Sequence, residues 1–222
     1  MPRYDLTALL ERDAVVPIFS RSDRTVAERV ADAVVGAGGS VLEFTNRQDN
    51  ALATFAHLAG YLRDGHAHVA LGAGTVFDAA TAIEFIARGA DFVVSPAFDA
   101  DVCAACADRG VPYIPGCFTA TEVRRAHEAG CSLVKLFPAA PVGTGYLRAL
   151  RSVFPTVRFL PTGGITADPK TVGKWLAAGA TAVGLGSDLI PPEGADRSDL
   201  EGVPEVLRPL LALRGGEGSP EG

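Results

Sequence analysis

The chain of 222 residues has few of the features that mark membrane proteins, nucleic-acid-binding proteins or secreted disulfide-rich proteins. No apolar run approaches the roughly 20 residues that cross a bilayer. The 20 basic and 26 acidic side chains are mixed along the sequence, and the net charge of -6 offers no basic surface for nucleic acid or an anionic membrane. Four cysteines in a chain of this length do not form a disulfide framework. We therefore expect no nucleic-acid or membrane partner.

The amino-terminal segment also lacks something, namely the apolar core of a secretory signal peptide. Together with the cysteine content this favours a cytoplasmic protein in a reducing compartment. A hydrophobic content of 48% is enough to bury a large core, and the length fits one sizeable domain.

What the sequence does contain is a regular alternation of apolar and amphipathic segments. Each apolar segment is followed by a segment with apolar residues at helical spacing, and several of the helical segments stop at a glycine. Continuous apolar runs are typical of parallel strands that are covered on both faces. The predicted strands are residues 14–19, 41–45, 68–75, 91–96, 111–115, 133–138, 157–161 and 182–187.

Eight strand–helix units, spaced by roughly 20–30 residues, predict an α/β protein with a single (β/α)8 TIM barrel. The alternative is a doubly wound open sheet, which would carry a glycine-rich dinucleotide turn after the first strand; residues 19–23 contain none. We expect residues 1–200 to form the barrel and residues 201–214 to form a helix packed on it. Residues 215–222 are expected to be a disordered tail.

One lysine interrupts the sixth apolar segment. Lys135 stands in the middle of Leu-Val-Lys-Leu-Phe-Pro, and lysine is rarely buried because an ammonium ion is costly to remove from water. A buried lysine commonly loses its proton, and the neutral amine is a nucleophile toward carbonyl groups. A lysine on the exposed face of the strand, paired with a neighbouring helix, is the structural alternative.

Polar and glycine residues gather where the predicted strands end. In a (β/α)8 barrel the active site lies at these carboxyl ends, so the residues there form one candidate site. The set comprises Glu43, Thr45, Arg47, Thr75, Pro96, Lys135, Thr162, Gly163, Gly164, Gly186 and Ser187.

Four segments resemble one enzyme family. They are GAGTV at 72–76, VKLFPA at 134–139, PTGGI at 161–165 and the E-x-T-x-R pattern from Glu43 to Arg47. These segments, in this order over nearly the whole chain, are similar to the 2-keto-3-deoxy-6-phosphogluconate (KDPG) aldolases, whose members often also cleave 4-hydroxy-2-oxoglutarate (KHG). The resemblance implies a class I aldolase without metal or cofactor, usually a homotrimer, in which Lys135 forms a Schiff base with the substrate.

The resemblance also implies the reaction and the catalytic roles. The substrate would be KDPG, cleaved reversibly to pyruvate and glyceraldehyde 3-phosphate, and KHG would give pyruvate and glyoxylate. An iminium at Lys135 would accept the electron pair of the breaking carbon–carbon bond, and Glu43 would be the general acid/base, partly through a bound water. Arg47 would hold the pyruvyl carboxylate with its planar fork, and Thr75 would add a hydroxyl donor.

Further residues are assigned to the ends of the substrate. The family pattern puts Pro96 and Phe137 in the wall around the pyruvyl group and Thr162 in contact with substrate. Two glycine turns follow adjacent strands, at 163–164 and at 186–187, where barrels commonly bind phosphate through backbone N–H groups. A lone Gly-Gly pair would more simply be a turn.

Departures from the family pattern leave the substrate open. Asn46 replaces a leucine of many members, and the segment Gly184–Leu189, GLGSDL, is closer to the 2-keto-3-deoxy-6-phosphogalactonate (KDPGal) aldolases. KDPGal is therefore the alternative substrate. A barrel that binds a phosphorylated sugar acid without converting it, and a phosphosugar isomerase or epimerase, are further alternatives. Neither would require both Glu43 and Lys135.

Other chemically active residues carry weaker signals. Cys103 and Cys106 lie in a predicted helix without a second pair at zinc-binding spacing, so we interpret them as small apolar side chains. His66 and His68 precede the third strand and should lie at the opposite end of the barrel from the site. We expect no metal ligand cluster at the carboxyl ends.

Overall fold

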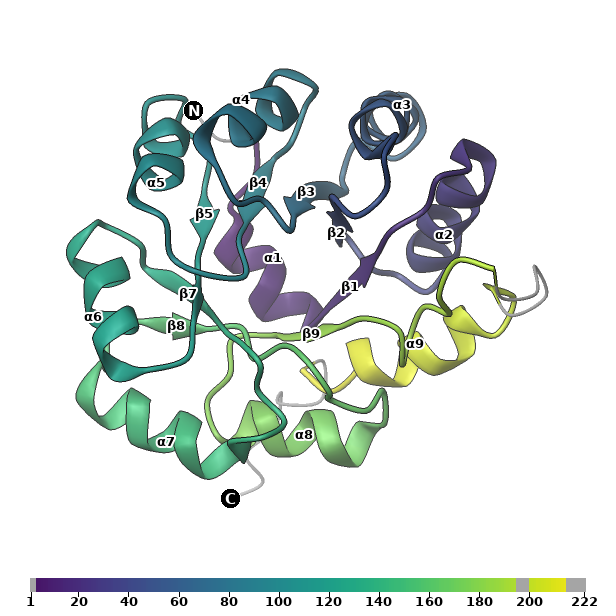
Figure 1. Cartoon of the computed structure of the whole chain (residues 1–222). Coiled ribbons are helices and arrows are strands. Elements are labelled where there is room, and N and C mark those ends of the chain that lie inside the picture. Colours follow the sequence, from purple (N-terminus) through teal and green to yellow (C-terminus); the bar gives the residue numbers. More distant parts are fainter. Residues whose placement is uncertain (1–2, 195–199, 215–222) are drawn as a thin grey trace.

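A computed structural model describes residues 3–194 and 200–214 and shows an α/β protein with helices around parallel strands (Figure 1). Six strands form one curled parallel sheet in the order β5-β4-β3-β2-β1-β9. These strands are β1 (Val15–Phe19), β2 (Val41–Thr45), β3 (Ala70–Gly74), β4 (Phe92–Val94), β5 (Tyr113–Ile114) and β9 (Val183–Leu185). The parallel α/β architecture predicted from the sequence is confirmed.

Three further strands, β6 (Gly116–Cys117), β7 (Leu133–Leu136) and β8 (Arg158–Phe159), form a second parallel sheet. The fifth strand, predicted at residues 111–115, is observed as β5; after Pro115, which has no N–H to donate, the chain continues as β6 in the second sheet. The Pro115 carbonyl accepts from Lys135 N at 2.8 Å. At the other edge, Gly184 N donates to Pro161 O at 2.9 Å and Thr181 N donates to Phe159 O at 2.8 Å. Backbone hydrogen bonds thus link the two sheets on both sides.

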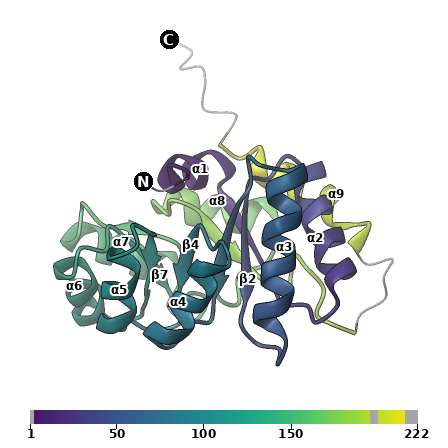
Figure 2. The same ribbon diagram turned by 90° about the horizontal axis from the view of Figure 1, so that it is seen from above.

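The helices predicted between the strands are present on the outside of the strands (Figures 1 and 2). Several begin at an aspartate whose side chain accepts a backbone N–H of the first turn, including Asp23, Asp78, Asp99 and Asp168. The helices that follow the strands are α2 (Arg24–Gly36), α3 (Ala51–Gly65), α4 (Ala79–Ala87), α5 (Ala100–Ala107), α6 (Ala120–Glu128), α7 (Gly143–Val153), α8 (Pro169–Ala177) and α9 (Val203–Leu211).

One helix, α1 (Leu6–Asp13), was not predicted. It lies across one end of the strands rather than on their outside (Figures 1 and 2). Leu6 and Leu10 are buried against strand residues that face the inside of the curl, and α1 leads directly into β1. The helix therefore closes the amino end of the strands and leaves the carboxyl end for a site.

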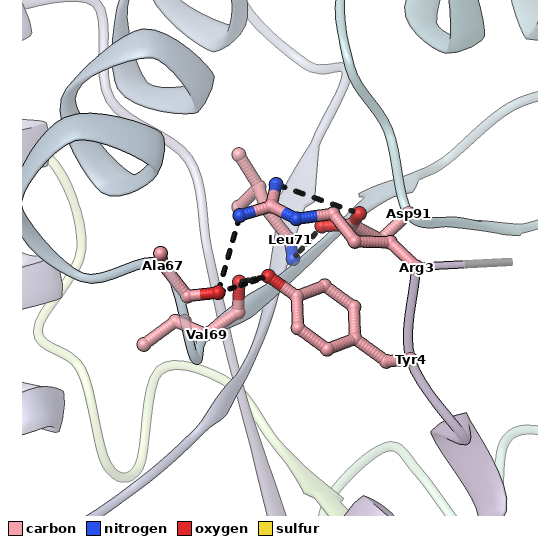
Figure 3. Close-up of polar contacts among 6 residues, drawn as sticks. All are labelled: Arg3, Tyr4, Ala67, Val69, Leu71 and Asp91. Carbon is pink, nitrogen blue, oxygen red and sulfur yellow. Dashed lines mark hydrogen bonds and ion pairs between the residues drawn. The ribbon is translucent and has the colours of Figure 1, made fainter.

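The residues before α1 attach this closure to the sheet (Figure 3). The Tyr4 hydroxyl donates to the carbonyls of Ala67 and Val69 at 2.7 and 3.0 Å, just before β3. Arg3 Nη1 lies 3.9 Å from a carboxylate oxygen of Asp91, whose other oxygen accepts from Leu71 N at 2.9 Å. The amino-terminal segment is thus bonded to the starts of two neighbouring strands.

Alternation along the strands sorts side chains into an outer and an inner layer. In β2, Leu42 and Phe44 pack outward under the helices, whereas Val41 faces inward. In β7, Val134 packs outward and Leu133 inward. Residues two positions further along share the inner face. The alternation therefore directs Glu43 and Lys135 into the interior of the curled sheet.

A carboxyl-terminal helix was expected at residues 201–214; the structure has α9 there, over Val203–Leu211, in contact with α2 and α8. Arg208 Nη2 donates to Gly36 O at 3.3 Å. The expected tail at 215–222 lies outside the described residues. None of the helices in the described part of the chain has the length and apolar character needed to cross a bilayer.

Candidate active site

A cavity of about 490 Å³ opens at the carboxyl ends of the strands. Every residue that the sequence assigned to the candidate site lines this cavity, together with residues from the loops after β1 and β9. The predicted lining residues are Glu43, Thr45, Arg47, Thr75, Pro96, Lys135, Phe137, Thr162, Gly163, Gly164, Gly186 and Ser187. Residues separated by more than 140 positions in the chain therefore share one site.

Lys135 and Glu43 meet at the buried end of the cavity. Lys135 Nζ lies 3.2 Å from Glu43 Oε1 and 3.4 Å from Oε2, and both side chains are nearly out of solvent, with 10% and 1% of their surfaces exposed. The structural alternative, in which Lys135 lies on an exposed face of its strand, is therefore excluded. A buried amine in direct contact with a carboxylate can exchange a proton with it across a single hydrogen bond.

The surroundings of this pair are shaped by a glycine and an aromatic ring. A Cβ at Gly74 would lie 2.2 Å from Glu43 Oε1, so the glutamate can occupy its position only because residue 74 has no side chain. On the other side, Lys135 Nζ lies 5.6 Å from the centroid of the Phe137 ring. The ring shields the amine and is positioned for a cation–π contact when the amine is protonated.

Threonines at or after the ends of β2, β3 and β8 line the same cavity. Thr75 adopts a left-handed backbone conformation with φ of 61°, which is unusual for a β-branched residue and is found preferentially at functional sites. Thr45 donates to Phe19 O at 3.2 Å, and Thr162 donates to Leu160 O at 3.3 Å. These bonds fix the orientations of both hydroxyls while their oxygens can still accept.

The two predicted glycine turns also line the cavity. Gly163 and Gly164 both have positive φ, 98° and 71°, and Phe137 packs over the position a Gly163 side chain would take. Gly186 and Ser187 follow β9, and the carboxylate of the adjacent Asp188 accepts from Ala167 N. The loops after β8 and β9 are thereby held together.

Among the described residues, two arginines line the cavity, of which the sequence assigned only Arg47. Arg47 is exposed and has no carboxylate partner among the described residues. The second, Arg21, follows β1 and is 5% exposed. Its guanidinium donates to the carbonyls of Ser20, at 2.7 Å, and Pro191, and burial lowers its pKa. The sequence signal that could have identified Arg21 as a cavity residue was its position shortly after a predicted strand.

The histidines lie where the sequence placed them, away from the cavity. His66 and His68 precede β3, and His66 Nε2 is 3.3 Å from Asp32 Oδ1 on α2. Within residues 3–194 and 200–214, no group of three or more His, Cys, Asp or Glu side chains has an arrangement that could hold a metal ion.

Fold and cavity together define a class: parallel α/β proteins with a buried lysine at the carboxyl end of a strand, paired with a glutamate inside a polar cavity. Within that class, the sequence model of the KDPG and KHG aldolase family matches residues 6–206. The chain belongs to this family, as the four motif segments had indicated.

Individual relatives agree with this assignment. The chain is 36% identical to a 2-dehydro-3-deoxy-phosphogluconate aldolase of Treponema pallidum, over 93% of this chain and 96% of the relative. It is also 36% identical to the 2-dehydro-3-deoxy-6-phosphogalactonate aldolase of Escherichia coli, but over only 54% of this chain and 58% of that one. The structure of a Legionella pneumophila KDPG aldolase with pyruvate captured as a covalent carbinolamine superposes with a TM-score of 0.84, at 28% identity, covering 94% and 98% of the two chains.

Proposed function

We propose that this protein is a class I aldolase that cleaves KDPG to pyruvate and glyceraldehyde 3-phosphate through a Schiff base at Lys135. The observation that carries the proposal is the contact of Lys135 Nζ with the Glu43 carboxylate at the buried end of the cavity. A nucleophile and a proton acceptor in direct contact are what cleavage beside a keto group requires.

Each step of the reaction has a group of this chain to perform it. The free amine of Lys135 adds to the C2 carbonyl, and loss of water gives an iminium. Glu43, directly or through a water, takes the proton of the C4 hydroxyl as the C3–C4 bond breaks. The bonding electron pair moves into the iminium, leaving an enamine and the aldehyde. The enamine carbon then takes a proton, and water hydrolyses the iminium to pyruvate and the free amine.

The two ends of the substrate would be held by different parts of the cavity. Arg47 is assigned to the pyruvyl carboxylate, with Thr75 as an additional hydrogen-bond donor. Pro96 and Phe137 are assigned to the wall around the pyruvyl group. The turns at Gly163–Gly164 and Gly186–Ser187 would receive the phosphate through backbone N–H groups. Both turns line the same cavity and both glycines of the first have positive φ, which supports this assignment.

KDPGal is the second candidate substrate, because the GLGSDL segment that carries Gly186 and Ser187 lines the cavity and a KDPGal aldolase is among the relatives. The two substrates differ in the configuration of one hydroxyl. The enzyme can distinguish them only by how well it stabilises each transition state, which the ratio of their kcat/KM values measures. The experiment that decides between them measures the rate of pyruvate release from KDPG, KDPGal and KHG at equal concentration. We expect the highest kcat/KM for KDPG; a higher value for KDPGal would reassign the substrate.

The same measurement addresses the non-catalytic alternative. A barrel that only binds a sugar acid phosphate would release no pyruvate from any of the three compounds. An isomerase or epimerase would convert its substrate in the Lys135→Ala variant as well, because it has no need of a Schiff base.

Architecture and assembly form part of the proposal. We propose that the two sheets act as one closed (β/α)8 barrel covering residues 1–200, with β5 and β6 as halves of one strand, because hydrogen bonds link the sheets at both edges. A homotrimer is proposed from the family; light scattering should give three times the chain mass of 23.0 kDa. The cysteines of the described structure are free thiols, which supports a cytoplasmic location.

A further inference from the structure

The cysteines of this chain lie on neighbouring elements, outside the lining of the Lys135 cavity. Cys103 and Cys106 lie on α5, Cys117 on β6, and Cys131 between α6 and β7. Cys103 Sγ and Cys131 Sγ are 3.7 Å apart, which is van der Waals contact between two sulfur atoms. None of the four residues lines the cavity.

The local backbone holds the Cys103–Cys131 pair in place. Cys103 Sγ donates to Ala129 O at 3.6 Å, at the end of α6. Gly130, with φ of 95°, then reverses the chain, and Cys131 N donates to Ala126 O at 3.0 Å. The turn directs the Cys131 side chain back toward α5. The contact between the sulfurs is therefore built from a helix end and a glycine turn, both of which are well-defined elements.

We propose that Cys103 and Cys131 form a dithiol modification site that a hydroperoxide oxidises reversibly to an intramolecular disulfide. In the first step the Cys103 sulfur attacks the peroxide, the O–O bond breaks, and a sulfenic acid and one water (for hydrogen peroxide) are formed. In the second step the Cys131 sulfur displaces hydroxide from the sulfenic sulfur, and a second water leaves. Two thiols are oxidised by two electrons, and the peroxide is reduced to two waters.

Accessibility decides which sulfur reacts first. Cys103 is partly exposed, whereas Cys131, Cys106 and Cys117 are buried. Burial raises the pKa of Cys131, and raises the pKa values of Cys106 and Cys117 to about 12, so their thiolates are scarce at neutral pH. Cys103 is thus the entry point, and Cys131 is the neighbour that resolves the sulfenic acid. Closing the bond requires the sulfurs to approach from 3.7 Å to about 2.05 Å.

The disulfide would join α5 to the start of β7, the strand that carries Lys135. Because the pair lies outside the cavity, the site does not depend on the aldolase proposal. Pyruvate trapping at Lys135 should continue in the oxidised protein, so failure of one proposal can be told from failure of the other.

The test is oxidation of the full chain with hydrogen peroxide, followed by intact mass and peptide mapping without reduction. We expect a mass lower by two hydrogens, a cross-linked pair of peptides containing Cys103 and Cys131, and full reversal by dithiothreitol. Cys106→Ala and Cys117→Ala are matched controls and should oxidise like the unmodified chain. Cys103→Ala should lose the cross-link, and Cys131→Ala should accumulate oxygen on Cys103 instead.

Three results would overturn the proposal. One is a folded protein that keeps four alkylatable thiols under peroxide that oxidises a small dithiol. Another is an intramolecular cross-link that survives in Cys103→Ala or Cys131→Ala. The third is a disulfide that maps to Cys106 or Cys117, or that joins two chains. The first and third results are read on the unmodified chain, so the proposal can be overturned even where a variant fails to fold.

Discussion

Lys135 and Glu43 form an ion pair almost completely removed from water, with their charged atoms 3.2 Å apart. Removing two charges from water costs several kcal/mol per ion, and replacing such a pair with apolar groups often does not reduce stability. The pair is therefore weak evidence for a structural role. Its position at the inner end of a 490 Å³ cavity favours a chemical role, in which the amine reacts and the carboxylate moves protons.

A first prediction at the residue scale concerns Glu43. The Glu43→Gln variant keeps the shape and a hydrogen-bond acceptor for Lys135 but cannot take a proton. We expect the rate of KDPG cleavage to fall by about 10²–10⁴-fold, the usual contribution of general acid–base catalysis. The measurement is kcat from pyruvate release, with circular dichroism to confirm folding. Activity within about threefold of the unmodified enzyme would remove Glu43 from the mechanism.

A second prediction uses Gly74. In Gly74→Ala the new methyl group would overlap Glu43 Oε1, because the two would be 2.2 Å apart. The carboxylate should move off Lys135, and a displacement of this size can lower kcat about 10²-fold. Gly60→Ala on α3 is the matched control, since nothing lies within 4 Å of its new methyl group. Equal activities of the two variants would contradict the assigned role of the contact.

At the residue scale the sequence predicted the lining of the cavity well, because strand ends in a parallel α/β protein converge. Arg21 was missed. Its guanidinium is turned into the cavity by hydrogen bonds to Ser20 O and Pro191 O, and the second of these comes from a loop 170 positions away. A contact over that distance in the chain is set by tertiary folding and has no local sequence signal.

At the scale of elements, α1 shows how a short helix can decide where a site lies. Its apolar residues, Leu6, Leu9 and Leu10, have helical spacing, but the segment is only eight residues long and was not predicted. Isolated helices of that length are marginal in water, so α1 depends on burial against the strands. Closing the amino end leaves the cavity at the carboxyl end as the open side.

The corresponding prediction is that α1 contributes strongly to stability. Leu10 is 1% exposed, and Leu10→Ala should lower the free energy of unfolding by about 2–5 kcal/mol, as expected for a large-to-small change in a core. Leu9→Ala, on the same helix but only partly buried, is the control and should cost less. Urea unfolding followed by circular dichroism measures both. Similar midpoints for the two variants would show that α1 is not part of the core.

A pH prediction belongs to the connection between the amino-terminal segment and the sheet (Figure 3). Burial raises the pKa of Asp91, although Leu71 N–H and Arg3 oppose the shift. With a folded pKa above the unfolded value of about 3.9, the contribution of Asp91 to stability is complete below that value. It is lost as the pH rises through the folded pKa, when the partly buried carboxyl ionises.

Asp91→Asn tests this sign, because the amide oxygen can still accept from Leu71 N while the charge is removed. Relative to the unmodified protein, the variant should be more stable at about pH 7 than at about pH 3.5. The measurement is urea unfolding at both pH values, with exposed Asp64→Asn on α3 as the control for a change in net charge. A stability difference that moves in the opposite direction would show that the Arg3 ion pair outweighs burial.

At the scale of the whole molecule, the parallel α/β arrangement could be predicted because each apolar run and each glycine stop is a local signal. The change from one sheet to the other at Pro115 could not be predicted, since it depends on which neighbouring strand pairs with β5 and which with β6. The identity of the aldehyde product is also a property of the whole cavity. It depends on loops after β1, β8 and β9 that come together only in the folded chain.

The most direct test of the account is borohydride trapping with pyruvate, read by intact mass and peptide mapping. Lys135 should acquire a reduced pyruvyl adduct, and Lys135→Ala should acquire none while remaining folded. Lys170→Ala, which removes an exposed lysine at the start of α8, is the control and should be trapped like the unmodified protein. An unmodified Lys135 at saturating pyruvate would contradict the Schiff-base mechanism, and the buried pair with Glu43 would then need another explanation.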